Sequence, residues 1–471
     1  MDNLIRRPLI VSALAAIAIA LVGAPSAGAQ VETATQLSSF DRIAVAFSQA
    51  RQVFSVVRST GSFGNVVEEI TAPPIGSSVP VPRNLAWAPG AGSLAVTESG
   101  FAQGNLLRII EHPGGAVHNL SPKIEQLRGP QSQATVLAAP RFGAPVSGGL
   151  RIMLGITPLG VVALRPDGSD PRILTPTTII AGDRALFDSG LREVATKITH
   201  TQNGRSYTDV VVRDLVSGVE TAQLTNTPFV SERHVTLSPD GSRVAYIEGP
   251  FEDTGDGSRL FIVNTNGTGR TAISPDSSLS YSQPAWRPDG LRIAFIGHRR
   301  ASSNGGFLGK PVVYSIKPDG TDLQRHTSLN GAGFPTQTNA NGVPVEDLAW
   351  GRTCTVLLSC SSGLSLVEPD TSGLEVLIQP QLSAAASVGI LVERYVRRRL
   401  VAVGRVPFGT RRRGRPRISW NGRVNGRRLR PGRYRITLRR LASGIPVEVA
   451  QPVDLVVPRR GPARVARPRR L

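Results

Sequence analysis

The chain has 471 residues, including 49 glycines and 36 prolines but only 5% aromatic residues. This length is enough for two domains, and frequent turn residues between short apolar runs favour an all-β fold. The net charge of +20 does not describe a uniformly basic protein, because residues 381–471 alone hold 24 arginines, no lysine and three acidic residues. The other 380 residues hold 30 basic and 31 acidic side chains, so the basicity belongs to a C-terminal module.

Residues 1–29 have the pattern of a secretory signal peptide. Arg6 and Arg7 precede an apolar stretch from Leu9 to Val22, which is too short to span a bilayer comfortably. Ala27-Gly28-Ala29 then supplies the small residues of a cleavage site. We therefore expect an exported protein that is periplasmic, cell-wall-associated or extracellular and has no transmembrane helix after cleavage. An uncleaved N-terminal anchor is the alternative.

A motif with a period near 50 residues repeats through residues 30–380. It has the form hydrophobic-x-Pro-Asp-Gly-x-Arg-aliphatic-Ala and is clearest from Leu237 to Ala245 and from Trp286 to Ala294. Proline presets the first turn position, aspartate tolerates the second and glycine accepts a positive φ, so the chain reverses between two strands. The residues assigned to such turns are Pro239, Asp240, Gly241, Pro288, Asp289, Gly290, Pro318, Asp319 and Gly320.

Each repeat contains two turns and nearly continuous β-branched runs, which predicts a four-stranded meander covered on both faces. The hairpins of six such units begin near Ile43, Leu85, Ala134, Ala185, His234 and Pro284. Asp347 to Trp350 starts like a seventh unit, and we expect it instead to pair with Arg42 to Phe47 and to close a ring. Radial stacking would bury both faces of every unit, which predicts a six-bladed β-propeller. An open β-solenoid or a pair of sandwiches is the alternative.

The two clearest repeats, Leu237 to Ala245 and Trp286 to Ala294, resemble the WD-like repeat of the TolB propeller family. The resemblance extends over roughly Phe40 to Glu375. It implies a six-bladed propeller that binds protein partners. We expect no counterpart of the α/β domain that precedes the propeller in that family, because the repeats begin soon after the predicted signal.

Two cysteines and one acidic loop lie within or beside the repeats. Cys354 and Cys360 would be about 20 Å apart in a straight strand at ~3.3 Å per residue, so a disulfide requires the chain to fold back between them. The sequence leaves two alternatives, a disulfide between the two cysteines and two buried free thiols. Asp253 and Asp256 in the loop 252–257 are the candidates for a metal ion, but the loop lacks the alternating ligands of a calcium site, and we expect a solvated hairpin.

Residues 381–458 form a second pattern of turns and alternating strands. Trp420-Asn421-Gly422, Asn425-Gly426 and Pro431-Gly432 are turn signals, and Ile436 and Leu438 alternate with Arg435, Thr437 and Arg439 to give one core face and one basic face. The segment resembles the immunoglobulin-like domain of the FlgD type, which implies a small β-sandwich in an accessory role. We expect residues 459–471 to be a basic disordered tail.

The arginine runs of this module are candidates for binding an anionic envelope polymer or lipid, because a guanidinium group offers paired donors to phosphate or carboxylate. The nominated residues are Arg397, Arg398, Arg399, Arg411, Arg412 and Arg413. A solvated cationic face without a ligand is the alternative. Export argues against nucleic acid as the partner.

The sequence contains no Gly-x-Ser-x-Gly, His-Glu-x-x-His, Cys-x-x-Cys or phosphate-binding loop. We therefore expect no catalytic residue, cofactor or metal. The expected function is that of a non-enzymatic propeller scaffold for a protein or peptide of the cell envelope. The alternative is a propeller enzyme of the lactonase or glycan-lyase type with its site in the central channel. A cluster of Asp, Glu and His at one channel mouth would favour the enzyme, and a small or apolar lining would favour the scaffold.

Overall fold

The computed structural model describes most of the propeller region and of the C-terminal module. The described residues are 41–47, 52–58, 65–70, 81–100, 104–112, 115–128, 137–143, 150–157, 159–175, 183–187, 189–249, 258–274, 279–300, 307–327, 345–352, 363–366, 376–396, 399–450, 452–458 and 464–465. The predicted signal peptide, the cysteines Cys354 and Cys360, the loop residues Asp253 and Asp256, and Arg397 and Arg398 lie outside them. In the described part, no helix has the length and apolar character to cross a membrane.

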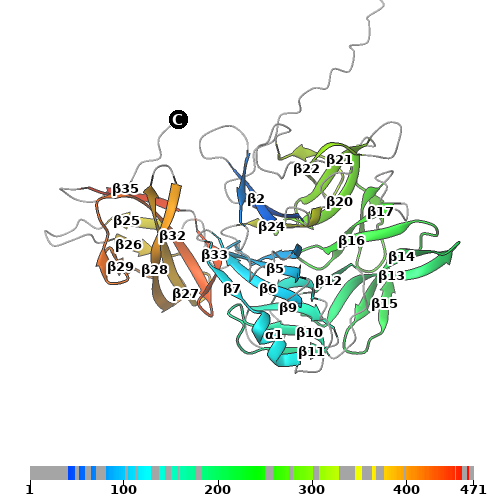
Figure 1. Ribbon diagram of the computed structural model, residues 1–471, viewed down its shortest axis with the longest axis horizontal. Helices are drawn as coiled ribbons and strands as arrows, with labels where there is room; N and C mark the ends of the chain where they lie inside the picture. The colour runs from blue at the N-terminus through cyan, green and yellow to red at the C-terminus, as the bar shows by residue number, and fades with distance from the viewer. Residues whose placement is uncertain are drawn as a thin grey trace, which may run out of the picture. The chain divides into compact units, whose positions relative to one another are not determined.

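Six antiparallel sheets of four strands form the propeller (Figure 1). The first three blades, each from its innermost strand outward, are β24 (Val345–Arg352), β1 (Asp41–Phe47), β2 (Gln52–Arg58) and β3 (Asn65–Glu69); β4 (Val81–Trp87), β5 (Ser93–Gly100), β6 (Gly104–Glu111) and β7 (Val117–Asn119); and β8 (Leu137–Gly143), β9 (Arg151–Ile156), β10 (Gly160–Leu164) and β11 (Arg172–Thr175). The helix α1 (Ser121–Arg128) follows β7.

The last three blades have the same order. They consist of β12 (Arg184–Leu186), β13 (Arg192–Gln202), β14 (Arg205–Asp214) and β15 (Glu220–Gln223); β16 (Ser231–Leu237), β17 (Arg243–Gly249), β18 (Arg259–Asn264) and β19 (Thr271–Ala272); and β20 (Leu279–Trp286), β21 (Ile293–Arg300), β22 (Phe307–Ile316) and β23 (Gln324–Arg325). Apolar side chains of adjacent blades share buried clusters; Val210, Val235 and Val244 belong to one of them. The chain is therefore an all-β propeller whose core lies between blades.

The ring is closed by strands from both ends of the repeat region. Strand β1 pairs with β24, with Ile43 opposite Trp350 and Val45 opposite Leu348, so the predicted pairing is confirmed. The side chains of Ile43 and Val45 are fully buried. The indole Nε1–H of Trp350 donates to Oδ1 of Asp41 at 3.2 Å, which adds a side-chain bond to the seam.

The Pro-Asp-Gly segments lie at the tips of hairpins. Gly241 has φ +72°, and its N–H donates to the carbonyl of Ser238 at 2.9 Å. Gly290 has φ +71°, and Gly320 has φ +80°. A carboxylate oxygen of the aspartate before each glycine accepts the N–H two residues further on, at 2.9–3.1 Å. These aspartates therefore stabilise turns, and a positive φ is the reason for the glycines.

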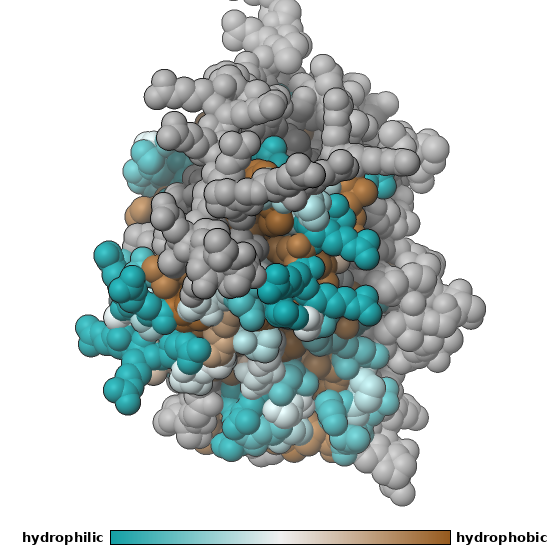
Figure 2. All heavy atoms as spheres, turned by 90° about the vertical axis from the view of Figure 1, so that its left-hand side faces the viewer, coloured by the Kyte–Doolittle hydropathy of each residue, from teal (hydrophilic) through white to brown (hydrophobic). Residues whose placement is uncertain are grey.

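Two further sheets form a β-sandwich in the C-terminal module. The smaller includes two strands that precede residue 381 and consists of β25 (Gly363–Leu366), β26 (Val376–Gln379) and β29 (Ile418–Trp420), so the sandwich begins earlier in the chain than the sequence predicts. The larger consists of β28 (Arg399–Arg411), β27 (Ala386–Val396), β32 (Gly432–Ala442), β34 (Val453–Val457) and β35 (Arg464–Val465), with β33 (Ile445–Val449) also paired to β32. A two-stranded hairpin of β30 (Arg423–Val424) and β31 (Arg427–Arg428) pairs with neither sheet. Ile378, Trp420 and Ile436 share the buried core of the sandwich. Figure 2 views the side that carries β28 and β29, where hydrophilic side chains protrude from the described surface.

Two details of this module differ from the sequence-based expectations. Arg464 pairs with Val456, so the predicted disordered tail is ordered at β35, where the edge of β34 offers unpaired backbone groups. Thr437 and Arg439 do not lie on a solvated basic face, because they are only 1% and 2% exposed.

The burial of Arg439 has a physical reason within the compact unit Thr33–Leu471. Its guanidinium donates to Glu111 of β6 at 2.8 Å, and both side chains are 2% exposed. Nearby, Gly92 donates its N–H to the carbonyl of Val447 at 3.4 Å, and Val447 joins an apolar cluster with Leu154 of β9. The strand β33 is thus packed against residues of the second and third blades.

Candidate binding site at the channel mouth

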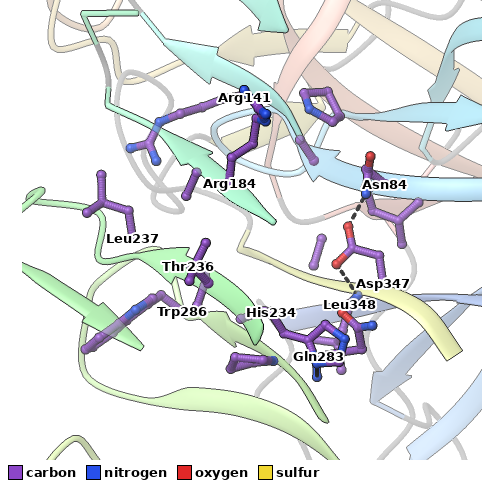
Figure 3. Close-up of a pocket in the computed structure, with 18 of the residues that line it drawn as sticks. Asn84, Arg141, Arg184, His234, Thr236, Leu237, Gln283, Trp286, Asp347 and Leu348 are labelled. Atoms are coloured by element: carbon purple, nitrogen blue, oxygen red, sulfur yellow. Dashed lines mark hydrogen bonds between the residues drawn. The ribbon is translucent and has the colours of Figure 1, made fainter. Parts of the chain in front are cut away.

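The innermost strands of all six blades line one cavity of about 790 Å³ (Figure 3). The residues of these strands line the cavity at two successive levels, here called tiers, because equivalent positions of the strands lie at the same level. The first tier is polar, and each of its residues lies three positions before the last residue with which its strand lines the cavity. It consists of Asn84, Asp183, His234, Gln283 and Asp347. The second tier stands two residues further along, at Ala86, Ala185, Thr236, Ala285 and Ala349. The cavity therefore has a polar ring at one level and a ring of small side chains at the next.

The third blade departs from this pattern. Arg141 pairs with Met153 in the register that Ala86 takes opposite Ala95 and Ala285 takes opposite Ala294. The ring of small side chains thus contains one long cationic group. A guanidinium at this position can hydrogen-bond carbonyl or carboxylate oxygens of a bound chain.

β-Bulges occur at two residues of the polar tier, His234 and Gln283. The register shifts between Arg233 and Thr236 in β16 and between Ser282 and Ala285 in β20. His234 and Gln283 have φ values of +53° and +49°, which non-glycine residues seldom adopt. Bulges and strained backbone of this kind are frequent at binding sites, where they redirect a side chain.

Side chains of one blade bond to backbone N–H groups of the next. Oδ2 of Asp183 accepts the N–H of His234 at 2.5 Å, and Nδ1 of His234 accepts the N–H of Gln283 at 3.5 Å. Between β24 and β4, Oδ2 of Asp347 accepts the N–H of Leu85 at 2.7 Å, as Figure 3 shows. The polar tier therefore joins blades four to five, five to six, and one to two.

These bonds limit the chemistry of the tier. Both carboxylate oxygens of Asp347 accept backbone N–H groups, because Oδ1 also accepts the N–H of Leu348 at 2.8 Å, whereas the bond of Asp183 to His234 uses Oδ2. Across the described residues, no three His, Cys, Asp or Glu side chains are arranged to hold a metal ion. The arrangement suits hydrogen bonding to a polar ligand.

A second group of polar residues is buried beside the cavity-lining strand β16. Thr227 donates its hydroxyl to Glu232, and its N–H donates to Oδ1 of Asp209 at 3.0 Å. Both carboxylates are fully buried. Burial, and then the nearby charges of Asp209 and Glu248, raises the pKa of Glu232 to about 8.

None of the cavity-lining residues was predicted from the sequence to bind a ligand, and Pro239 was assigned only to a turn. A signal for them was present, because Asn84, Gln283 and Asp347 each precede a tryptophan of the repeat by three positions. Of the six arginines nominated for anion binding, Arg399 is exposed on β28, and Arg411, Arg412 and Arg413 lie at and just beyond the end of that strand.

Comparison with known proteins adds weak similarities. No family model matches the chain. A stretch of 98 residues is 35% identical to dipeptidyl-peptidase 5 of Porphyromonas endodontalis and covers 20% of this chain but only 13% of that enzyme. Among solved structures, TolB of Acinetobacter baumannii is similar with 15% identity and a TM-score of 0.43 over 67% of each chain. An oligogalacturonate lyase in complex with manganese is similar with 11% identity and a TM-score of 0.36 over 58% of this chain and 72% of that one. The β-propeller class itself follows from the six sheets and their common cavity.

Proposed function

We propose that this protein is an exported, non-enzymatic propeller scaffold that binds a protein or peptide of the cell envelope at the mouth of its channel. The observation that carries the proposal is the ring of small side chains below the polar tier. The small side chains leave space for an extended peptide segment. The polar tier offers hydrogen-bond donors and acceptors to the main chain of that peptide. Export rests on the signal-like pattern of residues 1–29.

The hydrogen bonds of the polar tier give its side chains a structural role. Asp183 and Asp347 accept backbone N–H groups of the next blade, and Nδ1 of His234 faces the N–H of Gln283. The same bonds fix the positions of these side chains, which lowers the entropy lost when a ligand binds.

Photo-crosslinking tests the proposal. A photoreactive amino acid is placed at Thr236 in the channel and, in a control protein, at Val216, which is 66% exposed on a hairpin turn. Both proteins are irradiated with envelope extract, and the cross-linked species are identified by mass spectrometry. We expect a species specific to Thr236 that excess parent protein competes away. Excess Ala185→Trp protein, whose channel is filled, should not compete.

Two outcomes would contradict the proposal. Identical cross-linking patterns at Thr236 and Val216 would show that the channel is not where the partner binds. Conversion of a glycan or a lactone by the parent protein, and loss of that conversion in His234→Ala, would support the enzyme instead.

A further inference from the structure

The C-terminal module carries a run of arginines without any acidic residue. Residues 411–430 contain nine arginines and neither Asp nor Glu. This arginine cluster consists of Arg411, Arg412, Arg413, Arg415, Arg417, Arg423, Arg427, Arg428 and Arg430. Eight of the nine are exposed, and Arg411 is half-buried.

The acidic residues of the module do not neutralise the cluster. Asp454 pairs with Arg433 at 2.6 Å and Arg435 at 3.4 Å, and Glu448 pairs with Arg440 at 2.7 Å. Glu393, the remaining acid of residues 381–471, is 6% exposed and therefore buried.

Among the described residues, the hydrogen bonds of the cluster lead to uncharged oxygens. Arg415 donates to the side-chain oxygen of Gln381 at 2.9 Å, and Arg423 donates to the carbonyl of Gly426 at 2.8 Å. Such bonds orient the guanidinium groups without cancelling their charge. Within the described part of residues 381–471, the cluster therefore carries an excess of positive charge, which ions or a ligand from solution can balance.

The β30–β31 hairpin places like charges against each other. Arg423 and Arg428 are cross-strand partners, an arrangement that destabilises a two-stranded hairpin. The hairpin is held by its Asn-Gly turn, by Val424 in the sandwich core, and by a bond of 2.9 Å from Nε1 of Trp420 to the carbonyl of Arg423. The hairpin therefore keeps two neighbouring positive charges on the surface, where an anionic ligand can bind them.

We propose that the arginine cluster binds the phosphate headgroups of an anionic lipid bilayer. Guanidinium groups offer two parallel donors that match phosphate oxygens. The nine side chains come from a loop, a strand end and a short hairpin, and none of them lines the channel cavity. Exposed groups on turns and hairpins can meet a planar layer of headgroups together. This binding does not depend on the proposed function of the channel.

The test is co-sedimentation of the full chain with lipid vesicles. One set of vesicles contains phosphatidylglycerol and phosphatidylcholine, and the other contains phosphatidylcholine alone. The cluster variant changes Arg412, Arg413, Arg427 and Arg428 to Gln. The control variant removes the same charge from the propeller by changing the exposed arginines Arg172, Arg192, Arg205 and Arg259 to Gln. Circular dichroism and thermal unfolding check that both variants fold.

We expect the parent and the control variant to bind the anionic vesicles at about 0.05 M salt and to lose most of that binding at about 0.5 M, where charges are screened over a shorter distance. Each basic residue near an anionic surface contributes about fivefold in binding, so the cluster variant should bind at least ~100-fold more weakly. Binding to neutral vesicles, which the apolar stretch of residues 9–22 could cause, should be the same in all three proteins.

Three results would overturn the proposal. One is the absence of binding to anionic vesicles at low salt, which would leave a solvated surface. Another is an equal loss of binding in the cluster and control variants. The third is binding to soluble polyphosphate but not to the vesicles, which would identify a flexible polyanion as the ligand.

Discussion

The hydrogen bond across the closed seam can be measured because the chain contains its own control. Trp350 and Trp286 are 5% and 6% exposed and belong to the innermost strands of two adjacent blades. A guanidinium lies over each ring, that of Arg287 at 5.7 Å and that of Arg243 at 5.0 Å. Nε1–H of Trp350 donates to Asp41, whereas the buried Nε1–H of Trp286 meets no acceptor among the described residues.

Trp350→Phe removes the bond and leaves a carboxylate that is 4% exposed with one donor fewer. Loss of a hydrogen bond to a buried charged group costs about 1–3 kcal/mol. Trp286→Phe removes a donor that is already unsatisfied, so it has no such cost. The packing lost when indole becomes phenyl is common to both variants and cancels in their difference. We therefore expect Trp350→Phe to be less stable than Trp286→Phe by about 1–3 kcal/mol.

Urea unfolding followed by circular dichroism gives the free energy of unfolding for both variants and the parent. The dependence of that free energy on urea should be the same in all three, which shows that the same surface is exposed on unfolding. A difference between the variants of less than about 0.5 kcal/mol would refute the reasoning, since effects of that size are common for substitutions that break no specific interaction.

Four further substitutions test other parts of the fold. Gly241→Val and Gly290→Val should each lower stability by about 1–3 kcal/mol in thermal unfolding, because a β-branched residue resists the positive φ of both positions; an unchanged midpoint in both would contradict the turn geometry. The raised pKa of Glu232 means that the folded state holds this proton more tightly than the unfolded state, so this group's contribution to stability is complete below about pH 4.5 and is lost as the pH rises through about 8; Glu232→Gln should remove that loss in urea unfolding at pH 5, 6.5 and 8, and an identical pH profile would count against it. Arg439→Ala removes one partner of the buried Glu111, which keeps Arg405 at 3.0 Å and His118 at 2.7 Å, and should cost about 1–3 kcal/mol by urea unfolding; an unchanged free energy of unfolding would show that the Arg439–Glu111 pair does not stabilise this contact.

The propeller was predictable from the sequence because its signals are local. Proline, aspartate and glycine act within one turn, and the spacing of the turns fixes the number of strands in a blade. The pairing of β1 with β24 followed from an incomplete unit at Asp347 to Trp350. The likeness of residues 381–458 to an immunoglobulin-like domain of the FlgD type stays a prediction, although two sheets with a shared core are present.

The cavity and the buried pairs were not predictable, because they depend on contacts between distant segments. His234 enters the cavity through a bulge, and Asp183, 51 positions earlier, accepts its N–H. Arg439 stands in an alternating strand, where the pattern indicates an exposed basic residue. Only the position of Glu111, 328 residues away, explains its burial.

The double role of the polar tier decides how the channel can be tested. Asp183 and Asp347 face the cavity, but they also satisfy backbone N–H groups of the next blade. Removing either side chain would leave a donor unpaired and weaken the ring, so a loss of binding in such a variant would not identify a ligand contact. The ring of small side chains offers the better positions, because a larger residue at Ala185 can exclude a ligand without removing these bonds. Loss of binding together with unchanged stability in Ala185→Trp would therefore be evidence about the ligand itself.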